Sequence, residues 1–303
     1  MDIISKGLKM NKYIQIPGKI LIYKYTYLYI IIEVYKMTEA TVLFHQGYTD
    51  ILNHLPLLSY YQKKFKKLHV IIREEAVPIL QQYLLSSKYS NIEMIVMKKN
   101  HLDILFVSSE SIRLFLEIQN LTKTYLLFFG IFDVYRDDRY KHAFNNAQRK
   151  GIFFSEAFYT AYDLPYSLRL DEFEYDRSSR QIQTIEHDLF KKFCFKHSID
   201  IDKPFEYILY HDDETTKAVI EFSNKSSSLS LNKMSNSFFD CLKILENAKE
   251  LHLIDSSWAC LTYFMDAKYG FMKEKKVFLY AKRDYGEMFR SPKVLLNWNI
   301  ISR

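Results

Sequence analysis

Short apolar runs alternate with helical patterns from Ala40 onward. The first pair is an apolar run at Ala40–His45, followed by a turn that contains Gly47 and a helix that begins near Asp50. Strands that alternate with helices favour a parallel sheet covered by helices. The same order continues, with expected strands and helices at Leu68–Arg73, Glu74–Leu85, Ile92–Met97, Glu110–Leu121, Thr124–Ile131 and Phe153–Tyr162. The sequence therefore predicts a Rossmann-like α/β domain.

A second series of alternating elements follows the charged segment Asp171–Arg180, which is typical of a linker. We expect helices and strands there at Gln181–Lys196, Phe205–Tyr210, Lys217–Phe222, Ser226–Leu231, Phe238–Ala248, Glu250–Ile254, Ala259–Met265, Lys276–Tyr280 and Val294–Ile300. A chain of 303 residues is long enough for two domains. We therefore predict two Rossmann-like domains facing a cleft, at residues 38–175 and 176–303.

The segment before this pattern, residues 1–37, is interpreted as an N-terminal extension of uncertain status. Its apolar and aromatic stretch at 19–36 is interrupted by Lys24 and Glu33, and its uninterrupted core is too short for a typical membrane span. No small-residue cleavage site of a signal peptide follows it. We favour Met37 as the natural start, with a membrane anchor at 19–36 as the alternative that is not favoured.

Charge and cysteine content narrow the class of function. The net charge is +6, but the Lys and Arg residues are spread along the chain, which does not favour nucleic-acid binding. No Walker-type loop or Gly-x-Gly-x-x-Gly fingerprint is present, which argues against a kinase or a dehydrogenase. The three cysteines form no Cys-x-x-Cys pair, a pattern that favours reduced, buried thiols and a cytoplasmic setting.

The stretch Ile254–Trp258 joins an expected strand to an expected helix through Asp255, Ser256 and Ser257. The first turn of a helix offers free backbone N–H groups, and serine hydroxyls beside it add further donors, so an anion is favoured there. Asp and Ser are also ordinary N-cap residues. The stretch is therefore either a phosphate or nucleotide site or a simple helix cap.

The first half carries a comparable motif, Gly47-Tyr-Thr-Asp-Ile-Leu-Asn-His-Leu-Pro-Leu-Leu58, directly after its first strand. It resembles the start of the heptosyltransferase-like glycosyltransferases of the GT-B fold, although Thr49 stands where that family has Gly. The resemblance implies that Asp50 is the base that deprotonates an acceptor hydroxyl. The alternative is an aspartate that only interacts with the helix dipole.

The second motif resembles the donor site of the same family, a strand followed by Asp-Thr/Ser-Gly and a helix. Asp255 and Ser256 match it, whereas Ser257 replaces a Gly and Cys260 stands where the family usually has His. The resemblance implies an inverting, metal-independent sugar transfer from a nucleotide-sugar co-substrate to a glycan or other hydroxyl acceptor, with no further cofactor. The alternative function is a non-catalytic protein that keeps the fold and binds a nucleotide or a glycan.

Other polar residues follow the expected strands of the two halves. His45, Gln46 and Gly47 are candidates for the acceptor side, and His211 and Lys217 for the donor side, although structural histidines and surface lysines are the common alternatives. Asp212 and Asp213 follow His211, but no third ligand has metal-like spacing. We therefore do not expect a metal site.

Overall fold

The computed structural model describes residues 38–44, 47–86, 90–105, 109–129, 154–160, 162–202, 206–213, 217–232, 234–235, 237–282 and 298–301. The chain divides into two compact units, Met1–Thr38 and Glu39–Arg303. The stretch at 19–36 and the proposed start at Met37 lie outside the described residues. Within the described ranges, no helix combines the length and the apolar character that a membrane crossing requires.

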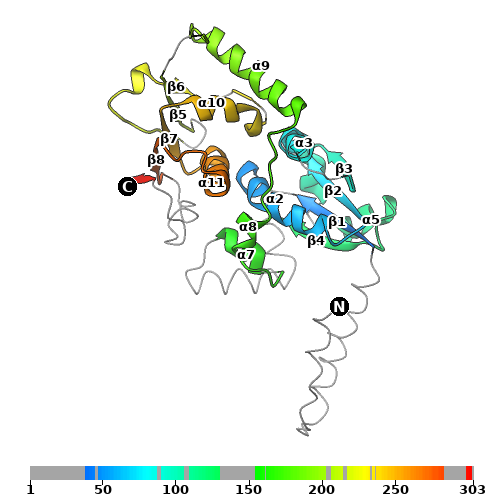
Figure 1. The fold of residues 1–303 in the computed structure, drawn as a ribbon. Coiled ribbons are helices and arrows are strands. Elements are labelled where there is room, and N and C mark those ends of the chain that lie inside the picture. The colour runs from blue at the N-terminus through cyan, green and yellow to red at the C-terminus, as the bar shows by residue number, and fades with distance from the viewer. Residues whose placement is uncertain are drawn as a thin grey trace, which may run out of the picture. The chain divides into compact units, whose positions relative to one another are not determined.

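The first sheet contains four parallel strands in the order β3-β2-β1-β4 (Figure 1). Its central strands consist almost entirely of buried apolar and β-branched residues, as expected for a parallel sheet that is covered on both faces. The strands are β1 (Glu39–Phe44), β2 (Lys67–Arg73), β3 (Ile92–Met97) and β4 (Tyr125–Phe129).

Helices connect these strands as the sequence predicts. Two helices of this half, α4 and α8, are not among those that the sequence predicts. The helices of this half are α2 (Tyr48–Gln62), η1 (Glu74–Ala76), α3 (Val77–Ser86), α4 (Lys99–Leu105), α5 (Ser109–Ile118), α7 (Phe154–Thr160) and α8 (Leu168–Asp171). Helix α2 is buried around most of its circumference, which is typical of a helix that packs against neighbours on several sides.

The second sheet contains five parallel strands in the order β6-β5-β7-β8-β9. Its elements are α9 (Arg180–Lys196), β5 (Ile208–His211), η3 (Lys225–Ser227), β6 (Leu229–Ser230), η4 (Phe238–Cys241), α10 (Leu242–Asn247), β7 (Glu250–Ile254), α11 (Ser257–Tyr269), β8 (Lys276–Tyr280) and β9 (Asn299–Ile301). Two parallel sheets connected through helices confirm the predicted α/β class.

The expected strand at Lys217–Phe222 is wrong. This segment forms only an isolated antiparallel bridge between Asp213 and Ala218, and Lys217 has a positive φ of 56°. The apolar residues that suggested a strand instead pack over the sheet, where buried Ile220 joins a cluster with Ile254 of β7. The alternating apolar and polar residues of this segment therefore belong to a loop that covers the sheet.

The segment between the two sheets is anchored in the core. Phe173 and Tyr175 are buried, and their rings stack on Phe264 of α11 and Phe239 of η4 at centroid distances of 4.8 and 4.4 Å. The placement of the domain boundary in this segment remains a prediction, but the segment itself packs against elements of the second half.

Replacement of Phe173 by alanine tests this anchoring. We expect Phe173→Ala to lower the free energy of unfolding by about 3–5 kcal/mol, because it leaves a cavity among stacked rings. Urea unfolding measures the loss, and Phe195→Ala is the matched control because the Phe195 side chain is 89% exposed. A loss below about 1 kcal/mol in both variants would show that the segment is not part of the core.

Candidate functional site

The candidate residues lie where the strand order of each sheet reverses. In the first sheet, β1 lies between β2, the next strand along the chain, and β4, the last strand of this sheet. In the second sheet, β5 and β7 lie between β6 and β8, so the chain leaves β5 in one direction and β7 in the other. Ligands of parallel α/β sheets bind at the carboxyl ends of the strands at such a switch point. Helix α2 follows β1, and α11 follows β7.

The first turns of α2 and α11 are in direct contact. The Thr49 Oγ1 and Ser257 Oγ atoms are 2.9 Å apart, at hydrogen-bonding distance. The Cys260 Sγ atom contacts the Thr49 carbonyl oxygen at 4.0 Å. The two helices lie side by side in Figure 1. The three positions at which the chain departs from the glycosyltransferase motifs therefore meet one another.

Asp50 is the third residue of α2, after the N-cap residue Gly47 and two helical residues. Burial raises the pKa of its carboxyl group from 3.8 to about 7, although a hydrogen bond from the Gly47 backbone and the positive charge of Arg73 both act to lower it. A general base works best when its pKa lies near the operating pH. The bond to Gly47 also resembles a capping box, so Asp50 combines a structural contact with a pKa suited to proton transfer.

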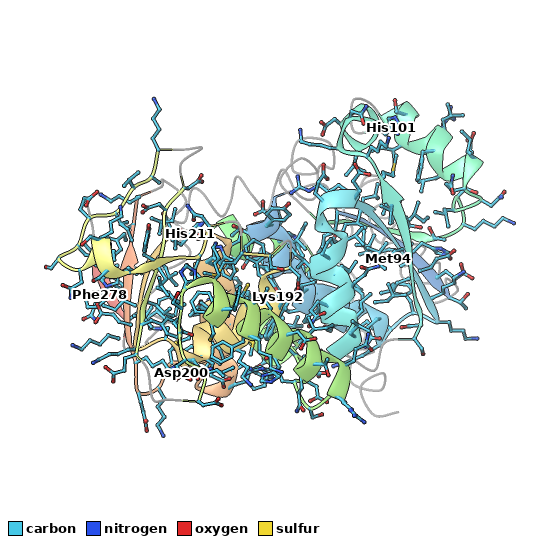
Figure 2. All side chains as sticks on the ribbon, turned by 90° about the horizontal axis from the view of Figure 1, so that it is seen from above. Met94, His101, Lys192, Asp200, His211 and Phe278 are labelled. Atoms are coloured by element: carbon cyan, nitrogen blue, oxygen red, sulfur yellow. The ribbon has the colours of Figure 1, made fainter. Side chains whose placement is uncertain are left out.

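The N-terminus of α11 has no side-chain cap. Ser256 is the N-cap residue, but its side chain does not cap the helix. Its Oγ atom lies 3.0 Å from Nδ1 of His211, the residue that ends β5 and is labelled in Figure 2. The backbone N–H groups of the first turn are therefore not occupied by the N-cap side chain, and the helix dipole favours an anion beside them.

Asp255 connects the end of β7 to the segment that follows β8. Its Oδ1 atom accepts the backbone N–H of Lys282 at 3.2 Å, and its own N–H donates to the Tyr280 carbonyl oxygen at 3.3 Å. The residue is 5% exposed. These contacts give Asp255 a role in shaping the turn before α11, and a direct contact with a donor remains a prediction.

The other candidates are placed differently. Lys217 is exposed, and none of its contacts in the described part of the chain joins it to Ser256 or Ser257. Asp212 pairs with Lys225 at 2.9 Å and therefore braces the loop over the sheet. His45 and Gln46 lie outside the described residues. Across the described ranges, no group of three or more His, Cys, Asp or Glu side chains has the arrangement of a metal site.

Arg73 is a site residue that the sequence analysis missed. It is the last residue of β2, and its guanidinium carbon lies 5.1 Å from the centre of the Tyr48 ring in the first turn of α2. Its charge acts on Asp50. The available sequence signal was a cation at the carboxyl end of an otherwise apolar strand.

Comparison with known proteins returns solved structures only. No protein-family model matches the chain, and no curated protein sequence matches it. One solved structure is a glycosyl transferase of family 9 from Veillonella parvula DSM 2008, which is 9% identical with a TM-score of 0.48 over 88% of this chain and 86% of that one.

The E. coli heptosyltransferase WaaC also matches, in complexes with ADP-2-deoxy-2-fluoro heptose and with ADP. Both are 12% identical over 87% of this chain, and they cover 92% and 93% of the WaaC chain with TM-scores of 0.38 and 0.39. All three structures are glycosyltransferases. The two sequence motifs resemble the same class of enzyme.

The raised pKa of Asp50 predicts a cost to stability. The folded carboxyl group keeps its proton up to about pH 7, whereas the unfolded one loses it near 3.8, so stability falls as the pH rises between these values. We expect Asp50→Asn to raise the free energy of unfolding at pH 8 by up to about 4 kcal/mol, and the gain to vanish near pH 4. Urea unfolding at pH 4, 6 and 8 measures this gain. A loss of stability at pH 8 would instead identify Asp50 as a helix cap.

Proposed function

We propose that the protein is a glycosyltransferase that moves a sugar from a nucleotide-sugar donor to a hydroxyl acceptor, with Asp50 as the base. The observation that carries this proposal is the contact between the first turns of α2 and α11. Asp50, a half-buried residue whose carboxyl pKa is raised to about 7, is adjacent to Thr49, which hydrogen-bonds to the first residue of α11. A proton acceptor and an anion-favouring helix terminus are thereby brought together.

The proposed chemistry is a single displacement. As the acceptor oxygen attacks the anomeric carbon of the donor, its proton passes to the Asp50 carboxylate and the bond from that carbon to the diphosphate oxygen breaks. Because the attacking and leaving oxygens lie on opposite sides of the carbon, this step inverts its configuration.

The donor diphosphate is proposed to bind at the N-terminus of α11. The first-turn amides and the Ser257 hydroxyl would stabilise the negative charge that develops as the nucleoside diphosphate leaves. His211 would orient the Ser256 hydroxyl, since the two side chains are already 3.0 Å apart. Amides and hydroxyls can supply this stabilisation without a metal ion, and Lys217 remains a predicted further contact.

All three cysteines lie in the described part of the chain, where they are buried and form no disulfide bonds, as expected for a protein in a reducing compartment. We infer a cytoplasmic setting on this ground. The acceptor is proposed to be a glycan or another compound with a free hydroxyl group.

A second function, nucleotide or glycan binding without turnover, is favoured by one observation. The hydroxyl groups of Thr49 and Ser257 are bonded to each other across the two first turns. If this bond stays formed when a nucleotide binds, the Ser257 hydroxyl remains bonded to Thr49 and does not stabilise the leaving diphosphate, so the ligand would be bound without transfer of a sugar.

A donor assay separates the two functions. We expect the wild type to consume one or more of the UDP-, GDP- and ADP-sugars, and Asp50→Ala to lower turnover by about 10²–10⁴-fold, the usual contribution of a general base. Calorimetric binding of the nucleoside diphosphate should be retained in the variant. The control is Asp103→Ala, because Asp103 pairs with Lys99 on the exposed side of α4.

Two results contradict the mechanism. Turnover that is the same in Asp50→Ala and in the wild type removes Asp50 as the base. Tight binding of a nucleoside diphosphate with no turnover of any donor, with or without added acceptor sugars, supports the binding function instead.

A further inference from the structure

Arg73 is a cation at the edge of the candidate site that forms no close ion pair among the described residues, although its charge acts on the Asp50 carboxyl group. Its Nε atom is buried and has no hydrogen-bond partner among the described residues. Within that part of the chain, no carboxylate lies within ion-pair distance of its guanidinium group, and Glu74 and Glu75 next to it are exposed. A buried N–H donor that has lost its water without gaining an acceptor is unfavourable, so a ligand acceptor is the expected compensation.

The position of Arg73 is fixed by the fold. In β2 it is paired with Met97 of β3, two residues beyond the pairing of Ile71 with Leu43 of β1. Arg73 therefore lies at the carboxyl edge of the sheet, on the side from which α2 starts. This edge is where parallel sheets bind their ligands.

An aromatic chain connects Arg73 to the N-terminus of α11. The guanidinium group lies over the Tyr48 ring, and Tyr48 contacts Phe238 edge to face at a centroid distance of 5.5 Å. Phe238 in turn contacts Trp258, in the first turn of α11, at 4.8 Å. The Tyr48 ring thus keeps the guanidinium group beside the first turn of α2. The planar fork of N–H donors of a guanidinium group matches the paired oxygens of a carboxylate or a phosphate.

We propose that Arg73 binds an anionic group of the acceptor substrate, a carboxylate or a phosphate, and so selects acceptors that carry a negative charge beside the reacting hydroxyl. The assignment to the acceptor rests on the proposed function, because Arg73 lies over Tyr48 in the first turn of α2, the turn that also contains Asp50, which is proposed to take the acceptor proton. The donor diphosphate has its own proposed site at α11. Arg73 is thus a specificity-determining residue.

Binding of such an anion also changes the pKa of Asp50, the proposed base. The positive charge of Arg73 lowers the pKa of Asp50 in the free protein. A bound anion neutralises that charge, so the pKa of Asp50 rises and the carboxylate becomes a stronger base when an acceptor is in place. The acid limb of the pH profile of kcat is therefore expected at a higher pH than that of kcat/KM.

The test is a calorimetric titration of the full chain with glucose 6-phosphate, glucuronate and neutral glucose, in the presence of a nucleoside diphosphate. We expect the two charged sugars to bind about tenfold or more tightly than glucose, and Arg73→Gln to remove this preference. Arg73→Lys, which keeps the charge without the planar fork, should retain part of it. Arg113→Gln is the matched control, because Arg113 lies on the exposed side of α5 and pairs with Glu117.

Equal binding of charged and neutral sugars by the wild type, or an unchanged preference in Arg73→Gln, overturns the proposal. A thermal unfolding midpoint that falls by more than about 5 °C in both Arg73 variants also overturns it, because Arg73 would then be a structural residue. The titration needs no turnover. Loss of the charge preference in Arg73→Gln together with unimpaired turnover by Asp50→Ala would therefore leave the Arg73 site intact and reject Asp50 as the base.

Discussion

The packing of α2 against α11 is the interaction on which the candidate site depends. Each helix begins directly after a strand of its own sheet, and each is buried around most of its surface because it packs on the other and on further elements of the fold. The hydrogen bond between Thr49 and Ser257 joins the first turns of the two helices. Because two helix N-termini with partial positive charge then lie together, the contact favours an anion near both. The candidate site thus depends on the contact between α2 of the first half and α11 of the second half.

Helix α2 carries ionisable groups that water solvates poorly. Asp50 and His54, one turn apart on α2, both have pKa values shifted by burial toward their neutral forms, to about 7 and about 4. A fold selected only for stability would not keep a carboxyl group there, since its ionised form is unfavourable at neutral pH. Sites that perform chemistry often retain such groups at a cost in stability. Asp50 combines such a shifted pKa with the capping-type hydrogen bond to the Gly47 backbone.

The sequence was most informative where apolar periodicity was strong. The strands at Ile92–Met97 and Lys276–Tyr280 were predicted with their observed bounds, because both are apolar runs between clear breaks. Lys217–Phe222 was misassigned because a loop that covers a sheet can show the same alternation as a strand. In the site, strand-to-helix turns identified the stretches that contain Asp50 and Ser256. Arg73 was missed because its relation to Asp50 arises from the pairing of β1 with β2, which local sequence does not reveal.

The central claim is that the first turns of α2 and α11 form one site for sugar transfer. A crystal structure with a bound nucleoside diphosphate tests it most directly. The account predicts phosphate oxygens at the first-turn amides of α11 and at the Ser257 hydroxyl, with the Asp50 carboxylate facing the space beside the terminal phosphate. A diphosphate bound on another surface, or an Asp50 side chain directed away from it, would contradict the account.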